Sequence, residues 1–352
     1  TDEAYIADIY YAASAQIVAK AAAVLGLEET RQNYQAIADR QWQVVKEEYF
    51  TATGRCAVKT QTGLVLALKY HLSDNERLTE QMLRKLLRDN KNKLNTGFVG
   101  TPLLCNVLTE HGMTDLAYRL LLNEEYPGWL HEVKLGATTV WERWNSLDEN
   151  GRISSTGMNS LNHYSYGAVL EWIFRHVAGI DVTEQGPGGK MMRISPKVDH
   201  KLGSASAVYD SASGCYRCGW QIENGDQITV TITVPFGAKA QVILPYAPDS
   251  VYHDTDNPLF ETVENGICCV KAGQYTVTYK AASPLKKSYS VDSTLEDLLA
   301  EPAIRAFLSN MMEVDMIPDL AYGLTLRQAA EAFAGGVSAE QAQRLNVLLE
   351  EF

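Results

Sequence analysis

The spacing of apolar residues changes near residue 190, and this change limits the fold more than any other feature of the sequence. Before it, apolar residues recur at helical spacing, as in the run from Ile6 to Val24 that Gly26 ends. After it, apolar and polar residues alternate as in strands, most regularly from 227 to 234. The sequence therefore predicts a helical region followed by an antiparallel sheet region with one buried face, which favours a β-sandwich.

This pattern divides the chain into three predicted regions: helices over 1–185, a β-sandwich over 186–288 and a small helical C-terminal extension over 289–352. The first helices form hairpins, and later helices are expected over 102–111, 114–124 and about 161–177. Strands are expected over 192–198, 204–210, 215–222, 226–234, 238–244 and 267–280. The long loops near 91–100 and 125–160 are rich in Gly, Trp, Asn and Thr, so we expect the functional residues there.

The net charge of −12 disfavours nucleic acid and anionic membrane surfaces as partners, because both attract basic surfaces. No apolar run reaches membrane-spanning length, and no secretory signal is visible at the start of the chain. Cys215, Cys218, Cys268 and Cys269 could supply a zinc site, but neighbouring residues of a strand point to opposite faces. We interpret them as free thiols in a reducing compartment, which favours the cytoplasm, and predict no metal or other cofactor.

The segment from Gly136 to Ser146 contains the most informative residues. Glu142 stands in it between Trp141 and Trp144 and next to Arg143. Tryptophan faces can bind the apolar faces of sugar rings, and a carboxylate held there can activate water or stabilise an oxocarbenium ion. Arg143 could also keep Glu142 ionised, as a general base must be. The segment therefore indicates a carbohydrate site.

Two further segments add polar and aromatic groups. Asn162 and His163 stand at the expected start of a helix and can hydrogen-bond sugar hydroxyls. Phe98 and Thr101 stand in a Gly-rich approach to another helix, where no Walker lysine follows. Each feature also has a structural interpretation: tryptophans three residues apart can be core, a Glu-Arg pair can lie on the surface, and a histidine can cap a helix. Their combination on long loops favours the carbohydrate site.

The segments 60–62, 97–102, 138–144 and 161–169 together resemble those of bacterial α-L-rhamnosidases of the six-hairpin glycosidase group. The resemblance implies an (α/α)6 barrel followed by a C-terminal β-sandwich. It also implies inverting hydrolysis of terminal α-L-rhamnose from glycosides or oligosaccharides, with Glu142 as general base. The implied substrate-binding residues are His163, Trp141, Trp144, Asn162, Phe98 and Thr101.

One family feature is missing, an acidic and Arg-rich segment that holds the general acid. The predicted helices are also fewer than an (α/α)6 barrel requires. Glu132, Glu110 and Asp148 could supply the second carboxyl group that inversion needs, but no motif supports any of them. We therefore expect a fragment with an incomplete barrel, whose general acid lies outside the chain and whose open apolar face favours self-association.

Two other functions stay open. One is an inverting glycosidase of different sugar specificity, because rhamnose specificity depends on the resemblance alone. The other is a non-catalytic carbohydrate-binding or scaffold fragment, in which the β-sandwich binds glycans. Replacing Glu142 by Gln separates catalysis from binding, since binding should survive while turnover falls if Glu142 is the base.

Overall fold

The computed structural model describes residues 1–148, 150–154, 157–254, 256–333 and 335–350. The chain forms two compact units, Thr1–Ala282 and Ser283–Phe352. The first unit contains the helical region and two β-sheets, and the elements described in the second are helices. A helical region followed by a largely antiparallel sheet region confirms the predicted fold class, and the described helices form no closed barrel. The predicted boundary at 185 stays a prediction.

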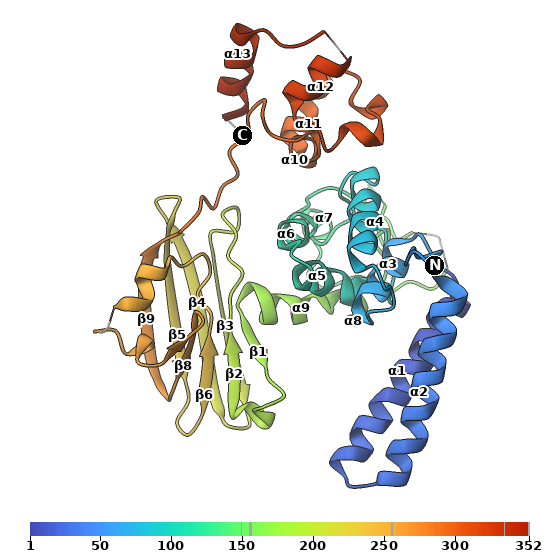
Figure 1. Cartoon of the computed structure of the whole chain (residues 1–352), viewed down its shortest axis with the longest axis vertical. Helices are drawn as coiled ribbons and strands as arrows, with labels where there is room; N and C mark the ends of the chain where they lie inside the picture. The colour runs from blue at the N-terminus through green and yellow to red at the C-terminus, as the bar shows by residue number, and fades with distance from the viewer. Residues whose placement is uncertain (149, 155–156, 255, 334, 351–352) are drawn as a thin grey trace. The chain divides into compact units, whose positions relative to one another are not determined.

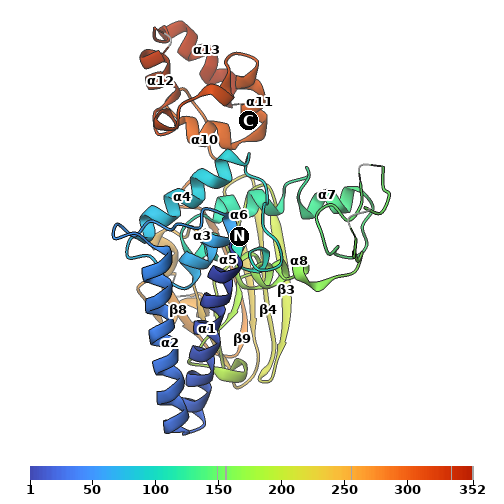
Figure 2. The same ribbon diagram turned by 90° about the vertical axis from the view of Figure 1, so that its right-hand side faces the viewer.

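The helical region begins with a long antiparallel hairpin of α1 (Glu3–Val24) and α2 (Glu28–Tyr49), which run side by side in both views (Figure 1, Figure 2). Asp2 caps α1, because its carboxylate accepts a hydrogen bond from the Tyr5 amide at 3.1 Å. The Tyr5 hydroxyl donates to the Gly63 carbonyl at 3.1 Å, which ties the hairpin to the next helix. The remaining helices are α3 (Gln61–Lys69), α4 (Glu76–Asp89), α5 (Thr101–Glu110), α6 (Thr114–Leu121), α7 (Trp129–Lys134), α8 (Tyr164–Gly167), α9 (Val169–Trp172) and the π-helix η1 (Ile173–Val177).

The apolar helix α3 lies at the centre of the helical region. Its residues from 61 to 68 are all buried, and it packs against α4 and α5. Thr60 caps its first turn through a hydrogen bond from the Gly63 amide at 3.0 Å. A helix that is apolar on every side is stable only when it is covered on every side, so α3 forms the scaffold for the loops that follow it.

The β-sandwich consists of two sheets with the strand orders β1-β2-β6-β8-β7 and β3-β4-β5-β9 (Figure 1). Alternate residues of β5, including Ile228, Val230 and Ile232, are buried between the sheets. All described pairs are antiparallel except β2 with β6, which is parallel. The strands are β1 (Ile180–Val182), β2 (Met191–Ile194), β3 (Ser204–Ser211), β4 (Gly214–Glu223), β5 (Gln227–Val234), β6 (Lys239–Val242), β7 (Val263–Glu264), β8 (Ile267–Val270) and β9 (Gly273–Lys280).

Three predicted elements are wrong in their extent. The strand expected over 267–280 is two strands, because β8 pairs in the five-stranded sheet and β9 pairs in the other. The helix expected over 161–177 begins only at Tyr164 and then divides into α8, α9 and the π-helix η1. The predicted strand over 192–198 also ends early, at Ile194, shortly before Pro196, which has no amide proton to donate to a neighbouring strand.

Specific bonds join the last helical turn to the sandwich inside the first unit. The indole of Trp220 on β4 donates to the Val177 carbonyl at the end of η1, at 2.7 Å. Two residues after the end of η1, Gly179 takes a left-handed φ of 81°, and its carbonyl accepts a hydrogen bond from the Ser195 amide at 2.8 Å. The Arg175 guanidinium pairs with Asp181 on β1 at 2.9 Å. The π-helix and the first strand are therefore held in fixed register.

The second unit is helical, and the predicted extension over 289–352 stays a prediction. The unit comprises α10 (Leu295–Ala300), α11 (Pro302–Ser309), α12 (Leu326–Phe333), α13 (Ala339–Glu350) and the 3-10 turns Val314–Met316 and Asp319–Ala321. Leu298, Ile304 and Leu349 are buried in a small core of its own. Thr294 caps α10 by accepting from the Asp297 amide at 3.1 Å. In the part of the chain that the structure describes, no helix is both long and apolar enough to cross a membrane.

Candidate active site

The two segments with the strongest sequence signals lie side by side. The Glu142 amide donates to the Ser160 carbonyl at 2.9 Å, and the His163 amide donates to the Val140 carbonyl at 2.8 Å. The Thr139 hydroxyl adds a bond to the carbonyl of Leu161. Backbone pairing therefore holds the predicted general base and the predicted sugar-binding histidine on adjacent stretches of chain.

Trp144 connects a third predicted segment, the loop before α5, to these two segments. Its indole N–H donates to the Thr96 carbonyl at 3.0 Å, in the loop before α5. Its ring stacks on Tyr166 with centroids 4.0 Å apart and planes 10° apart, and it meets Trp129 edge-on at 5.4 Å. Trp129 in turn donates from its indole to the Tyr166 carbonyl at 3.0 Å. These contacts form a rigid aromatic cluster from three elements.

Phe98 and His163 extend this cluster toward solvent. Their rings stack with centroids 5.0 Å apart, and Phe98 also meets Tyr166 edge-on at 5.9 Å. His163 caps α8, because its Nδ1 accepts a hydrogen bond from the Ser165 amide at 3.3 Å. A neutral imidazole that accepts at Nδ1 carries its proton at Nε2, so that nitrogen is a donor. Phe98 is 47% exposed, so part of its side chain is accessible to a ligand.

Glu142 is partly exposed at the edge of this cluster, whereas Trp141 before it is buried. Among the residues that the structure describes, no hydrogen bond or ion pair engages the Glu142 carboxylate. Arg143 follows it, and its amide donates to the Ser146 hydroxyl at 3.1 Å, which tightens the turn. A carboxylate that is held by its backbone but not by a structural ion pair can bind and deprotonate a water molecule.

Thr101 and Asn162 occupy less direct positions. Thr101 is buried at the start of α5, and its hydroxyl pairs with the Thr96 hydroxyl at 2.8 Å. It therefore supports the loop that Trp144 contacts. Asn162 is exposed, and its amide donates to the Ser160 hydroxyl at 3.1 Å. Trp141 is only 2% exposed and packs beneath the segment.

The three carboxyl groups considered for the second catalytic role lie in different surroundings. The Glu110 carboxylate forms ion pairs with the Lys69 ammonium and the Arg175 guanidinium, with an N–O distance of 3.7 Å in each. Asp148 is exposed and accepts hydrogen bonds from turn amides, including that of Arg152 at 2.8 Å. Only Glu132, on α7, contacts the Glu142 segment, through a hydrogen bond from the Trp141 amide. Its burial raises the pKa of its carboxyl group to about 7.

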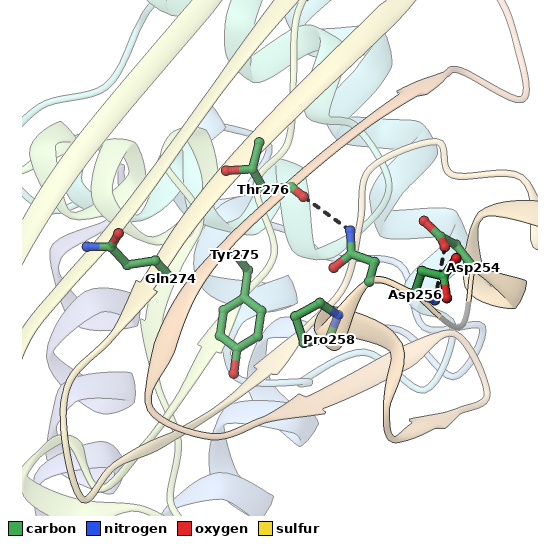
Figure 3. Close-up of a pocket in the computed structure, with 7 residues that line it drawn as sticks. Asp254, Asp256, Pro258, Gln274, Tyr275 and Thr276 are labelled. Atoms are coloured by element: carbon green, nitrogen blue, oxygen red, sulfur yellow. Dashed lines mark hydrogen bonds between the residues drawn. The ribbon is translucent and has the colours of Figure 1, made fainter.

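A separate pocket of about 350 Å³ lies on the β-sandwich and contains none of the predicted site residues (Figure 3). Asn257 is one of the residues that line it, and its side-chain amide donates to the Thr276 carbonyl at 3.2 Å. The exposed carboxylates of Asp254 and Asp256 stand beside it. Across the described residues, no group of three or more His, Cys, Asp and Glu side chains is arranged to hold a metal ion.

Comparison with known families matches nearly the whole of the first unit. The model described as the bacterial alpha-L-rhamnosidase 6 hairpin glycosidase domain matches residues 1–177. The model described as the bacterial alpha-L-rhamnosidase C-terminal domain matches residues 179–257. The two matches meet at 177–179, where Trp220 and Gly179 join the helical region to the sandwich.

Similar individual proteins carry the same description. An alpha-L-rhamnosidase of Formosa agariphila is 35% identical over 268 residues, which is 75% of this chain and 28% of that protein. One from Alteromonas sp. is 35% identical over 281 residues, 78% of this chain and 30% of that protein. The crystal structure of the Streptomyces avermitilis alpha-L-rhamnosidase complexed with L-rhamnose has a TM-score of 0.72 and 32% identity, covering 80% of this chain and 27% of that one. The chain thus spans less than a third of the length of these relatives.

Proposed function

The chain belongs to the bacterial α-L-rhamnosidase family, and we propose that it carries the general base of a hydrolase that releases terminal α-L-rhamnose with inversion. The observation that carries the proposal is the placement of Glu142. Its carboxylate is partly exposed, free of a structural ion pair among the described residues, and fixed beside His163 and the aromatic cluster. A sugar site with this composition suits a neutral substrate, in keeping with the acidic chain.

In the proposed reaction, Glu142 takes a proton from a water molecule as that water attacks the anomeric carbon. The bond to the leaving-group oxygen breaks at the same time, so the configuration inverts. The Nε2–H of His163 donates to a rhamnose hydroxyl, and the exposed face of Phe98 packs against the sugar ring. Trp144 holds the loop of Phe98 and the segment of Glu142 together, so it fixes the distance between ring and base.

Inversion also needs a protonated carboxyl group on the other side of the glycosidic bond. Glu110 and Asp148 are engaged in structural contacts, and Glu132 is buried beneath the Trp141 backbone. We therefore assign none of these three residues the role of general acid. We propose that the general acid lies in the part of the relatives' sequence that this chain does not span.

The proposal is tested by Glu142→Gln in the native protein, with Glu184→Gln on the exposed surface as matched control. Removing a general base should lower kcat on an aryl α-L-rhamnoside by about 10²–10⁴-fold, while L-rhamnose binding changes little. Proton NMR of the first product should show β-L-rhamnose. Full turnover in the variant, or α-L-rhamnose as first product, would contradict the proposal. Preferential hydrolysis of a different aryl glycoside would refute the rhamnose specificity alone.

A further inference from the structure

The four-stranded sheet of the β-sandwich ends in β3 on one side and in β9 on the other (Figure 1). β3 pairs residue for residue with β4 over its whole length, from Ser204 to Ser211, without a bulge. Among the described elements, its extensive contacts are with β4 alone. Val208 is 45% exposed and Tyr209 38% exposed, so the strand is open to solvent. A straight, unpaired edge of this length is a template for another strand.

The other three edges of the described sheets are protected against such pairing. β1 is only three residues long, and its Asp181 forms an ion pair with Arg175. β7 is only two residues long. β9 is covered, because the Asn257 side chain donates to the Thr276 carbonyl on its outer edge. Short strands, charges and covering groups are the usual protection of a sheet edge, whereas β3 contains no lysine, no proline and no bulge.

The hydrogen bonds of the sheet show which backbone groups of β3 face outward. The Ile222 amide donates to the Gly203 carbonyl at 2.8 Å, just before β3 begins. Because bonding alternates along an antiparallel strand, the odd-numbered residues of β3 bond to β4 and the even-numbered residues point away from it. Within the described part of the chain, no hydrogen bond engages the outward backbone groups. They belong to Ser204, Ser206, Val208 and Asp210.

The sequence of β3 suits pairing with a second copy of itself. In an antiparallel pair, outward residues must face outward residues, so even-numbered residues must face even-numbered ones. A twofold axis at Ala207 satisfies this for every outward residue: Ser206 faces Val208 of the second copy, and Asp210 faces Ser204 of the second copy. The one charge of each strand therefore stays away from its counterpart, and a small side chain faces each large one.

We propose that β3 is an interaction surface for a second copy of this chain, whose β3 pairs with it in antiparallel orientation about a twofold axis at Ala207. The two four-stranded sheets then form one continuous sheet across the dimer. Each copy uses its open edge for the other, so this association closes at the dimer. The surface lies on the β-sandwich, and its pairing does not depend on the proposed role of Glu142.

Hydrogen exchange of the peptide that contains β3, measured by mass spectrometry on the 352-residue chain, tests the pairing. The outward amides should exchange at least about tenfold more slowly at high protein concentration than at low concentration, because pairing engages their N–H groups. Ser206→Pro should abolish this difference, since proline removes an outward N–H and leaves the bonds to β4 in place. Ser206→Ala keeps the N–H, so this matched control should behave like the wild-type chain.

Val208→Lys replaces Ser206→Pro if that variant does not fold, because a lysine on a sheet edge opposes pairing. Wild-type β3 amides that exchange at the same rate at every concentration would overturn the proposal. Undiminished protection in a folded Ser206→Pro chain would overturn it too. Association through a different surface would leave these amides unprotected, so it would not be mistaken for strand pairing.

A disulfide across the axis tests the register. Ala207→Cys is combined with Cys218→Ala, because Cys218 faces Ala207 on β4 and would compete for the new thiol. In the proposed pair, the two new thiols face each other with Cα atoms about 4.5 Å apart, which a disulfide can span. Mild oxidation should therefore produce a covalent dimer. Cys218→Ala alone, which keeps the exposed Cys269, is the matched control. No more covalent dimer than in this control would overturn the register.

Discussion

Trp144 shows how much of the site depends on a single side chain. It donates to the Thr96 carbonyl, stacks on Tyr166 and meets Trp129 edge-on, so one indole joins three segments. Aromatic pairs of this kind add stabilisation beyond the area that they bury. The buried indole N–H also satisfies the Thr96 carbonyl in the loop before α5. Packing and hydrogen bonding at this residue therefore hold the base segment and the Phe98 loop together.

Trp144→Phe should lower the free energy of unfolding by about 1–3 kcal/mol, because the Thr96 carbonyl loses its donor and the smaller ring leaves space. Urea denaturation, followed at the unfolding transition of the first unit, measures this loss. The matched control is Trp42→Phe, since the Trp42 ring is partly exposed and contacts the Tyr70 ring at a centroid distance of 5.3 Å. We expect the control to cost less than about 1 kcal/mol. Equal costs for the two variants would argue against the linking role of Trp144.

Glu132 should make stability depend on pH in a defined direction. Its ordinary pKa of 4.5 applies to the unfolded chain, and its folded pKa is about 7. Between these values the folded state binds more protons, so the free energy of unfolding decreases as pH rises through this window. The loss should be on the order of 2–3 kcal/mol and absent in Glu132→Gln. Chemical denaturation at a series of pH values measures it, and parallel curves for wild type and variant would contradict the assignment.

At the scale of elements, the sequence predicts most helices and strands because their apolar periods are long and regular. It locates α5, α6 and β5 to within a few residues. It cannot show that 267–280 changes sheets, because the alternation continues through the crossing from β8 to β9. It also misses α7, a short helix inside a loop whose composition suggests no periodicity.

The same reasoning applies to the site. The segments of Glu142, His163 and Phe98 are visible in the sequence because unusual residues cluster in each. Trp129 and Tyr166 are not singled out there, since their roles depend on contacts such as the indole-to-carbonyl bond that spans 37 residues. Glu132 is likewise only one of several candidate acids until its burial is known. Sequence patterns predict which segments matter, whereas the contacts among them come from tertiary packing.

The junction between the helical region and the β-sandwich leads to a prediction at the scale of elements. A Cβ on Gly179 would lie 2.2 Å from the Pro196 nitrogen, and its φ of +81° is already unfavourable for other residues. Gly179→Ala should therefore cost more than about 3 kcal/mol. Gly112→Ala is the matched control, with φ +71° and no atom within 4 Å of the added Cβ, and should cost about 1 kcal/mol. Urea denaturation compares the free energies of unfolding of the two variants. Similar losses would contradict the prediction, because they would show that the backbone at the junction can move to accept the added Cβ.

At the scale of the whole molecule, each of the two units has its own buried core. In the first unit, several large apolar side chains of the α1–α2 hairpin are exposed. On α1, Tyr11 is 57% exposed, Ile17 67% and Val24 87%. Contiguous apolar surfaces of this kind promote association because burying them releases water. The predicted self-association through the open barrel face stays a prediction, and we expect these α1 side chains to take part in it.

Sedimentation velocity over a range of protein concentrations tests this association. The wild-type chain should show an average mass that rises with concentration. Ile17→Glu should shift the distribution toward monomer, because it puts a charge into the apolar contact. Val182→Glu, at a similarly exposed position on β1, should behave like wild type. A monomeric wild type at every concentration would refute the prediction.

The central claim is that Glu142 deprotonates the attacking water, and chemical rescue tests it most directly. Glu142→Ala in the native protein removes the base and leaves space for a small anion. Sodium azide should then restore turnover of an activated aryl α-L-rhamnoside and form β-L-rhamnosyl azide, because azide needs no base and attacks from the side where the water stood. The account predicts this rescue and this anomer. Undiminished hydrolysis without azide, or an α-configured azide product, would contradict it.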